Sequence, residues 1–449
     1  MFIPHTDKER QAMLKTIGKD SIKDLFADIP ESKRFPALDL PEGISEMEAY
    51  EQMSMLAYAN NSCEEMISFL GAGAYHHYIP AAVDLLIQRG DFFTAYTPYQ
   101  PEISQGTLQA IFEFQSLIAN LTGMEVSNAS HYDGATAAAE TCISAYYHFR
   151  KKRGNIILSP FIHPQYLETI KTYLQAISDI EIRIPDISKP VEFEDAFRKL
   201  VDKKTALVMV QYPDFLGNIL DYSAVSSFAH KNGALFAAIV YPMALGILKS
   251  PADMNADFIV GEGQSLGIPL NFGGPYLGFF TTRKELIRKI SGRIVGKTED
   301  EDGNHGYVLT LTTREQHIRR GKATSNICTN QGLNALAVSI YLSLLGKQGL
   351  KEVAYQCYQK AHYTASLIEG IKGFKVLNEQ PFFNEFVIQC PSDVDKIQNN
   401  LLEIGIIAGY NLESDYHARK NQLLIAVTEQ NTREDIDFFA NSLREVTSV

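Results

Sequence analysis

The stretch from Asp257 to Thr282 constrains the fold of this chain more than any other. Two apolar runs, 257–260 and 276–281, flank a loop with glycines at positions 261, 263, 267, 273 and 274. The runs are typical of buried strands, and the glycines allow positive φ angles and close backbone approach. No lysine lies between Lys249 and Lys284, so this strand–loop–strand unit offers no side-chain amine.

Composition excludes several classes of function. A net charge of −12 over 449 residues argues against nucleic acid and an anionic membrane surface as partners. No apolar run approaches the roughly 18–20 residues that span a bilayer, and the polar N-terminus lacks a signal-peptide core. The five scattered cysteines predict reduced thiols and a cytoplasmic location. No Cys-x-x-Cys or His-Glu-x-x-His spacing is present, so no metal site is predicted.

The middle of the chain alternates between continuous apolar runs and amphipathic segments. The apolar runs predict strands at 155–158, 180–184, 206–210 and 235–240, each followed by a proline. The amphipathic segments predict helices at 107–121, 135–150, 164–176, 192–201 and 222–231. Such alternation indicates an α/β fold with a mainly parallel sheet covered on both faces.

The two ends of the chain differ from this pattern. Residues 1–70 predict a helical arm, with helices over 8–25 and 46–70, which packs either on a partner or on the main domain. The large domain is assigned to 71–328, with an irregular charged segment over 283–325. Residues 329–449 predict a smaller α+β domain, with helices at 330–345, 350–368, 393–402 and 432–446 and strands at 374–377, 386–389 and 423–427.

Several longer motifs identify a family. They are Gly71-Ala-Gly-Ala-Tyr with His77 and Pro80, Thr94-Ala-Tyr-Thr-Pro-Tyr-Gln-Pro-Glu with Ser104-Gln-Gly, Asn128-Ala-Ser with Tyr132-Asp-Gly, Gly261-Glu-Gly-Gln-Ser-Leu-Gly with Phe272-Gly-Gly-Pro, Gly292-Arg-Ile-Val-Gly, Leu309-Thr-Leu with Arg314-Glu-Gln-His-Ile-Arg-Arg, and Lys322-Ala-Thr-Ser-Asn-Ile-Cys-Thr-Asn. This set resembles the glycine dehydrogenase (decarboxylating) subunit 1 family, the α chains of the split P-protein of the glycine cleavage system. The resemblance covers most of residues 1–449.

The resemblance implies a large domain of the fold-type-I, pyridoxal-phosphate (PLP)-dependent transferase type. It also implies that PLP is bound to a lysine of the partner, subunit 2, and that the two chains form an α2β2 heterotetramer. The complex decarboxylates glycine and passes the aminomethyl group to the lipoyl arm of the H-protein. PLP supplies the electron sink for that reaction.

Two positions agree with a non-catalytic role. In the catalytic chain of this family a His-Lys pair precedes an Ile-Pro, and counting back from Pro269 places Gln264 at the lysine position and Gly263 at the histidine position. Tyr241 stands where an aspartate would pair with the pyridinium nitrogen, although relatives of this chain often have Asp-Pro there. An amide forms no Schiff base, so the isolated chain is predicted to be inactive.

The family fold places active sites at the dimer interface, which implies that this chain completes the site of its partner. The candidate residues are Tyr96, Thr97, Tyr99, Gln100, Ser104, Gln105, Thr324, Ser325 and Asn326. A structural crossover held by prolines is the alternative for the first six. A basic cluster could bind an anionic group or the H-protein, or could be a solvated helix face: Arg314, His317, Arg319, Arg320 and Lys322. Gly321 replaces a glutamate that is usual in relatives.

Other features have simpler interpretations. The segment 128–137 lies where a PLP fold cradles phosphate, but a ligand-free helix cap is favoured. His76 and His77 are interpreted as residues that pack or form hydrogen bonds within the loop, and Cys328 as a buried thiol.

Two other functions of the chain remain open. One is an autonomous PLP enzyme that uses another lysine such as Lys322, and the other is a binding or regulatory scaffold without catalysis.

Overall fold

The computed structural model describes residues 4–187 and 192–446, so the outer limits of the expected first and last domains lie outside the described residues. The described chain forms two compact units, one ending at Asn61 and one beginning at Ser62. Among the described residues, no helix has both the length and the apolar character needed to cross a bilayer.

The first unit contains two helices, α1 (Asp7–Thr16) and α2 (Glu46–Tyr58), and each begins with a capping box. Both are shorter than the sequence pattern predicts. Gly18 takes a φ of 68° and ends the first helix well before residue 25. The second ends near Asn60, whose amide donates to the carbonyls of Leu56 and Ala57.

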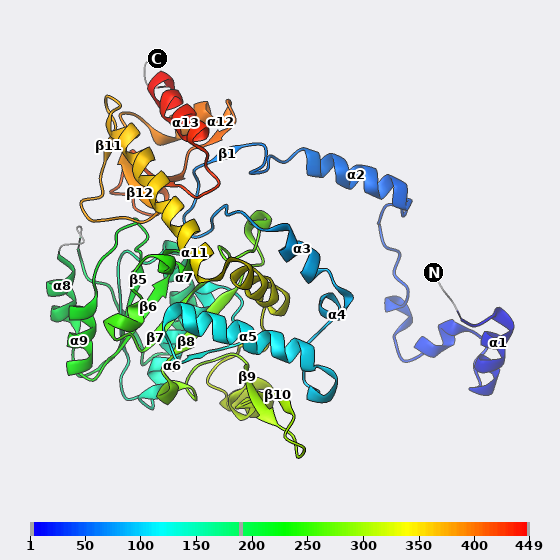
Figure 1. Ribbon diagram of the computed structural model, residues 1–449. Helices are drawn as coiled ribbons and strands as arrows, with labels where there is room; N and C mark the ends of the chain where they lie inside the picture. The colour runs from blue at the N-terminus through cyan, green and yellow to red at the C-terminus, as the bar shows by residue number, and fades with distance from the viewer. Residues whose placement is uncertain (1–3, 188–191, 447–449) are drawn as a thin grey trace. The chain divides into compact units, whose positions relative to one another are not determined.

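The second unit is built on a seven-stranded sheet (Figure 1) with the order β2-β8-β7-β6-β5-β3-β4. The strands are β2 (Val126–Ser127), β3 (Asn155–Leu158), β4 (Glu181–Arg183), β5 (Thr205–Tyr212), β6 (Leu235–Val240), β7 (Phe258–Glu262) and β8 (Gly278–Thr282). Strands β7, β6, β5, β3 and β4 pair in parallel, whereas β8 runs antiparallel to both of its neighbours. The prediction of a mainly parallel sheet is confirmed.

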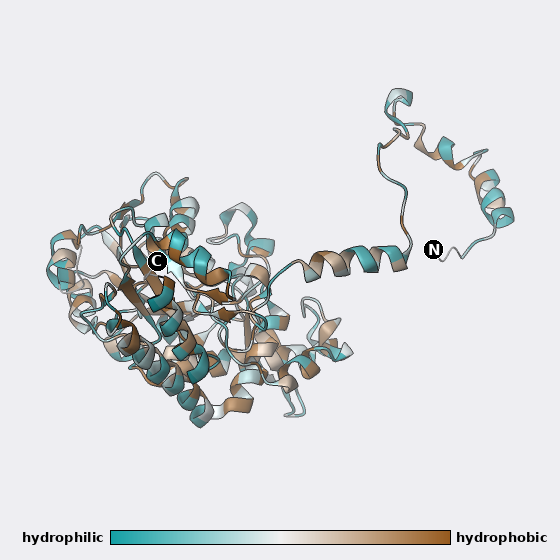
Figure 2. Ribbon diagram, turned by 90° about the horizontal axis from the view of Figure 1, so that it is seen from above, coloured by the Kyte–Doolittle hydropathy of each residue, from teal (hydrophilic) through white to brown (hydrophobic). Residues whose placement is uncertain are grey.

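Helices cover both faces of this sheet because successive side chains of each strand point to opposite sides. Ile156 and Leu158 pack in one apolar cluster with α6 (Gly134–His148) and α7 (Pro164–Leu174). Ile157 packs in the cluster on the other face. The helices of that second layer are α5 (Gln105–Thr122), α8 (Phe193–Leu200), α9 (Ser223–Lys231) and the first half of α11 (Gly332–Glu369). Figure 2 shows the apolar strands inside and polar helix surfaces outside.

This unit also contains α3 (Ala81–Ile87), α4 (Gly90–Phe93), α10 (Gln316–Arg319) and the antiparallel hairpin β9 (Ile294–Glu299) with β10 (His305–Thr310). The hairpin corrects the expectation of an irregular segment over 283–325. Its strands are mostly half-buried or exposed, so they lack the continuous apolar pattern by which the other strands were predicted.

The C-terminal part forms an antiparallel sheet with the order β11-β12-β15-β14. Its elements are β11 (Lys375–Val376), β12 (Glu385–Gln389), β14 (Tyr410–Asn411), β15 (Gln422–Ala426), α12 (Val394–Leu402) and α13 (Arg433–Val446). The short strand β1 (Ile67–Ser68) pairs with β13 (Ile406–Ile407). Helix α11 connects to this part and is interrupted at Gly346, where φ is 59°, as the two predicted helices require.

Candidate functional site

The candidate site lies at the carboxyl ends of β6 and β7, which are neighbours in the sheet. Ligands of open α/β sheets bind at these ends of the parallel strands. Tyr241 directly follows β6, and Gln264 follows β7 after a single glycine. The two positions that the sequence singled out therefore come together in one place.

Both polar atoms of the Gln264 side chain form hydrogen bonds with backbone groups. Its Oε1 accepts a hydrogen bond from the Tyr75 N–H at 2.8 Å. Its Nε2 donates to the carbonyls of Tyr75, at 3.0 Å, and Ile268, at 2.8 Å. The residue is 2% exposed. This amide thus joins the 71–80 loop to the loop that follows β7, a structural role that needs both a donor and an acceptor.

A carboxylate occupies the N-terminus of α6, where the resemblance places the PLP phosphate. Glu262 Oε2 accepts from the Gly134 N–H at 2.9 Å, and Oε1 accepts from the Leu277 N–H at 2.8 Å. Burial raises the pKa of Glu262 to about 7, although the N–H groups of Gly134 and Leu277 act against this. The helix terminus that would receive an anionic ligand already has an internal acceptor.

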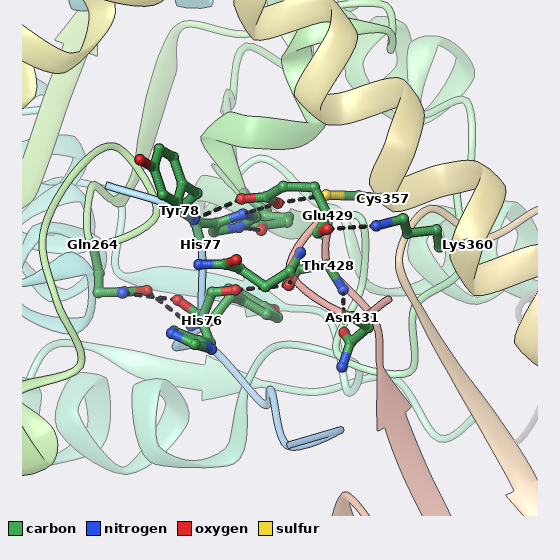
Figure 3. A network of polar contacts seen from close by, with 12 residues as sticks. His76, His77, Tyr78, Gln264, Cys357, Lys360, Thr428, Glu429 and Asn431 are labelled. Atoms are coloured by element: carbon green, nitrogen blue, oxygen red, sulfur yellow. Dashed lines mark hydrogen bonds and ion pairs between the residues drawn. The ribbon is translucent and has the colours of Figure 1, made fainter. Parts of the chain in front are cut away.

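Tyr241 is held by a chain of polar contacts drawn in part in Figure 3. Its hydroxyl lies 2.5 Å from His77 Nε2, and His77 Nδ1 lies 2.7 Å from Glu429 Oε2. Burial raises the pKa of Tyr241 well above its ordinary value. Burial also opposes ionisation of Glu429, but the hydrogen bond with His77 brings its pKa below the ordinary value. His77 thus forms hydrogen bonds with both groups.

The space left between these side chains is small. The cavity has a volume of about 30 Å³ and is lined by Gly73, Tyr75, His163, Tyr166, Gln211, Ile239, Val240, Tyr241, Glu262 and Ser265. That volume holds one or two water molecules. The lining contains no lysine and includes Tyr241 in place of an aspartate. The residues present therefore do not fit PLP: no lining residue offers an amine, and the helix terminus already has an internal acceptor.

Arg293 organises a second site and bonds Tyr99, one of the predicted interface residues. The Arg293 side chain is 3% exposed and donates from Nη2 to the Tyr99 hydroxyl at 3.1 Å and to the Cys328 carbonyl at 2.6 Å. Its Nη1 donates to Thr329 Oγ1 at 3.3 Å and Asn330 Oδ1 at 3.0 Å. One guanidinium thus ties the aromatic 92–105 loop to the 324–330 segment.

A hollow of about 160 Å³ lies beside this junction, and it is lined mainly by the aromatic loop, α5 and the start of α11. Tyr96 and Thr97 line it together with Phe93, Ile111 and Leu333. Tyr96 is 87% exposed. An aromatic side chain at the rim of an apolar hollow is suited to a protein contact.

The other candidates differ in their surroundings. Tyr99, Gln100 and Asn326 are exposed, and Thr97, Ser104, Thr324 and Ser325 are half-buried. Gln105 has a structural role, because its amide bonds both the N–H and the carbonyl of Tyr307 in β10. These placements leave the catalytic contribution of the set a prediction.

The basic cluster divides into two parts. Arg314 is largely buried and donates to the carbonyls of Ile290 and Gly292. His317, Arg319, Arg320 and Lys322 are exposed. Cys328 is also exposed, which corrects its interpretation as a buried thiol. Its carbonyl, rather than its sulfur, faces Arg293, so the segment turns the side chain outward.

A buried carboxyl, Glu140, lies beside Ser325 and gives a pH-dependent prediction. Burial raises its pKa from 4.5 to about 7, and the Ser325 and Ser291 hydroxyls oppose this. Its Oε2 has no partner among the described residues. Between pH 4.5 and 7 the folded chain thus holds more protons at this site, and the site's contribution to stability falls as the pH rises.

The free energy of unfolding of Glu140→Gln is expected to fall less than that of wild type as the pH rises over this range. At pH 8 the difference between the two falls reaches up to about 3 kcal/mol. Denaturant unfolding at pH 4.5, 6 and 8 measures how the free energy of unfolding changes with pH. The exposed Glu434→Gln serves as control and should leave it unchanged. Parallel curves for wild type and Glu140→Gln would contradict the assignment.

The order of the strands and the helix layers define the class: the chain has the fold of the fold-type-I PLP-dependent enzymes. A crystal structure of glycine decarboxylase (P-protein) of the glycine cleavage system, in inhibitor-bound form, matches with a TM-score of 0.91 and 40% identity over 99% of this chain and 100% of that one. A sphingosine-1-phosphate lyase from Burkholderia pseudomallei matches with a TM-score of 0.68 at 14% identity over 93% and 94% of the two chains, which shows the fold alone.

Sequence comparison is more specific. The model of the glycine cleavage system P-protein family matches residues 1–443. Two proteins named probable glycine dehydrogenase (decarboxylating) subunit 1 are similar along their whole length. The one from Thermomicrobium roseum is 50% identical with complete coverage of both chains, and the one from Brevibacillus brevis is 49% identical over 99% of each. The chain belongs to the glycine cleavage system P-protein family, and within that family it groups with the subunit 1 proteins.

Sequence reasoning did not single out four side chains that organise these sites: Glu262, Arg293, Glu385 and Glu429. Glu262 and Arg293 stand inside motifs that were recognised, where a charged residue between glycines was the available signal. Glu385 accepts from the Tyr75 hydroxyl at 2.7 Å and the Ala72 N–H at 2.8 Å across 310 residues or more of sequence. No local pattern marks such a contact.

Proposed function

We propose that this chain is the non-catalytic partner in a two-subunit glycine dehydrogenase (decarboxylating), in which subunit 2 carries PLP. The complex decarboxylates glycine and transfers the aminomethyl group to the lipoyl arm of the H-protein. The chain itself supplies a rigid scaffold and a contact surface. An α2β2 assembly and a cytoplasmic location belong to the same proposal, and the five free cysteines are compatible with that location.

The observation that carries this proposal is the state of the pocket at the ends of β6 and β7. Gln264 makes three hydrogen bonds to backbone groups, and Glu262 bonds the first N–H of α6. A ligand that entered here would have to break these hydrogen bonds, which weighs against a cofactor in this pocket. The exposed Lys322 lies outside the lining of this pocket, which weighs against an autonomous enzyme.

The surface that would complete the partner's active site is the junction around Arg293. Tyr96 and Asn326 are exposed there, and Thr97 and Ser325 are half-buried. The exposed cations Arg319, Arg320 and Lys322 are the proposed contact for an acidic H-protein surface.

The test compares the chain alone with the chain mixed with subunit 2. Alone, with added PLP, it is expected to show no Schiff-base absorbance and no glycine-dependent exchange of labelled bicarbonate. With subunit 2 and lipoylated H-protein, exchange is expected. The same assay on Arg319→Glu/Arg320→Glu measures docking, and a higher KM for H-protein is expected.

Two outcomes would overturn the proposal. One is borohydride-reducible PLP absorbance in the isolated chain, which would mean that a lysine of this chain binds the cofactor. The other is full exchange activity of subunit 2 without this chain, which would leave a binding or regulatory scaffold as the better description. An unchanged KM after the charge reversal would remove only the H-protein contact.

A further inference from the structure

Three metal-binding types of side chain meet in the polar network of Figure 3. His77 comes from the loop before α3, Cys357 from the second half of α11, and Glu429 from the loop after β15. One ring nitrogen of His77, the Cys357 Sγ and a Glu429 carboxylate oxygen all lie within 4.8 Å of one another, and His77 Nδ1 is 2.7 Å from Glu429 Oε2. Positions 77, 357 and 429 share no local sequence pattern, so the sequence could not predict this cluster.

The donor set fits a divalent transition metal ion. Imidazole nitrogen, thiolate sulfur and carboxylate oxygen are the three ligand types of protein zinc sites. Thiolate and carboxylate together balance the charge of M²⁺, so the occupied site would be neutral. This matters because Cys357 is fully buried and the Glu429 side chain is only 10% exposed.

The surroundings also resemble those of a metal ligand. A coordinating histidine usually has its second ring nitrogen bound to another polar group, which fixes the orientation of the ring. Here His77 Nε2 lies 2.5 Å from the Tyr241 hydroxyl. The Tyr78 N–H donates to Glu429 Oε1 at 2.7 Å, which holds the carboxylate, and Lys360 donates to the backbone carbonyl of the same residue.

We propose that His77 Nδ1, Cys357 Sγ and Glu429 Oε2 form a binding site for Zn²⁺, with water at a fourth position. The site would join the 71–80 loop, α11 and the segment before α13. The metal would fasten together the parts of the chain that surround the pocket at the ends of β6 and β7. It is independent of the proposed function, because it concerns residues that need no partner subunit.

Metal binding must displace protons that now hold the cluster together. Cys357 donates to Glu429 Oε2 at 3.3 Å, and His77 Nδ1 shares the same oxygen at 2.7 Å. Burial, followed by the Glu429 carboxylate, raises the pKa of Cys357 well above its ordinary value. On binding, the thiol proton passes to solvent, and the neutral imidazole carries its one N–H at Nε2, toward the Tyr241 hydroxyl oxygen. The Nδ1 lone pair, the thiolate and the carboxylate then face Zn²⁺.

The required movement is small. Around a tetrahedral Zn²⁺ with bonds of about 2.0–2.3 Å, neighbouring ligand atoms lie roughly 3.3–3.6 Å apart. The sulfur–oxygen distance of 3.3 Å already suits this geometry. The nitrogen–oxygen pair at 2.7 Å has to open by about 0.6 Å, and the sulfur starts no more than 4.8 Å from a ring nitrogen of His77.

The experiment uses the full chain, freed of metal with a chelator and then dialysed against Zn²⁺ or Co²⁺. Wild type is expected to bind one equivalent of Zn²⁺, to melt at a higher temperature with Zn²⁺, and to show thiolate-to-Co²⁺ charge-transfer absorption. The double variant Cys63→Ser/Cys328→Ser, which removes the two cysteines that are not buried, should behave like wild type.

Cys357→Ser keeps the size of the side chain and a donor toward Glu429, so its fold is expected to persist. It should lose the charge-transfer absorption and bind Zn²⁺ more than 100-fold more weakly, since even indirect support of a metal ligand is worth roughly 10–100-fold. Glu429→Gln should lose the stoichiometric binding too. If either variant fails to fold, the Co²⁺ spectrum of the double cysteine variant still shows whether a buried thiolate binds the metal ion.

The proposal is overturned by any of three results. They are no stoichiometric Zn²⁺ on wild type, no thiolate-to-Co²⁺ absorption in the double cysteine variant, or full retention of Zn²⁺ by folded Cys357→Ser. In these cases the three residues form only a hydrogen-bonded network.

Discussion

Replacing Arg293 with alanine is expected to lower the free energy of unfolding by on the order of 3 kcal/mol and to reduce exchange activity with subunit 2 about 100-fold. The side chain is buried and donates to four groups in two segments. Its loss leaves the Cys328 carbonyl and the Asn330 amide oxygen without their charged donor. The aromatic loop then loses its fixed position against the 324–330 segment.

The measurement has two parts, denaturant unfolding of the isolated chain and bicarbonate exchange of the complex. Arg293→Lys keeps the charge but not the forked geometry, so an intermediate loss is expected. Arg198→Ala is the control, because that side chain is about half exposed and makes an i, i+4 ion pair with Glu194 and a cation–π contact with Phe228. Its effect on the free energy of unfolding should stay within about 1 kcal/mol.

A third variant, Tyr96→Phe, separates structure from function at the same surface. Tyr96 is 87% exposed, so removing its hydroxyl should not change stability. A fall in exchange activity would then report a direct contribution to the partner's site. Unchanged stability in Arg293→Ala would show that the guanidinium does not organise the junction, and unchanged activity in both variants would remove the active-site-completing role.

How far the sequence predicts the fold depends on how local each signal is. The strands β3 and β6 have the predicted limits because each is a continuous apolar run that ends near a proline. The hairpin β9–β10 was missed, since its strands contact α5 on one side and are polar on the other. The arm helices were predicted too long because spaced apolar residues continue past Gly18 and Asn60.

The candidate site shows the same limit. Gln264 and Tyr241 could be found because a known chemistry requires other residues at their positions. The reason that the pocket is closed could not, since it depends on Glu262, Tyr75 and His77 meeting across long stretches of chain. A missing catalytic lysine predicts a lost reaction, but only the contacts of the replacing residue show whether the pocket has acquired a structural role.

Gln264→Lys tests that distinction, and it is expected to destabilise the chain rather than to restore PLP binding. Lysine has no acceptor, so the Tyr75 N–H would be left buried without a partner. The two carbonyls that Nε2 now bonds would face a buried ammonium group. The combined loss in the free energy of unfolding is expected to be on the order of 4 kcal/mol.

The comparison with Gln264→Met separates the two causes, because methionine has a similar size and no charge. If the buried charge contributes as argued, Gln264→Met should lower the free energy of unfolding by about half as much as Gln264→Lys. Absorbance and borohydride reduction with excess PLP complete the measurement. A folded Gln264→Lys chain that takes up one equivalent of reducible PLP would show that the pocket opens readily. In that case Glu262 would be only a placeholder for the phosphate, and the proposed non-catalytic role would rest on the absence of a lysine at position 264 alone.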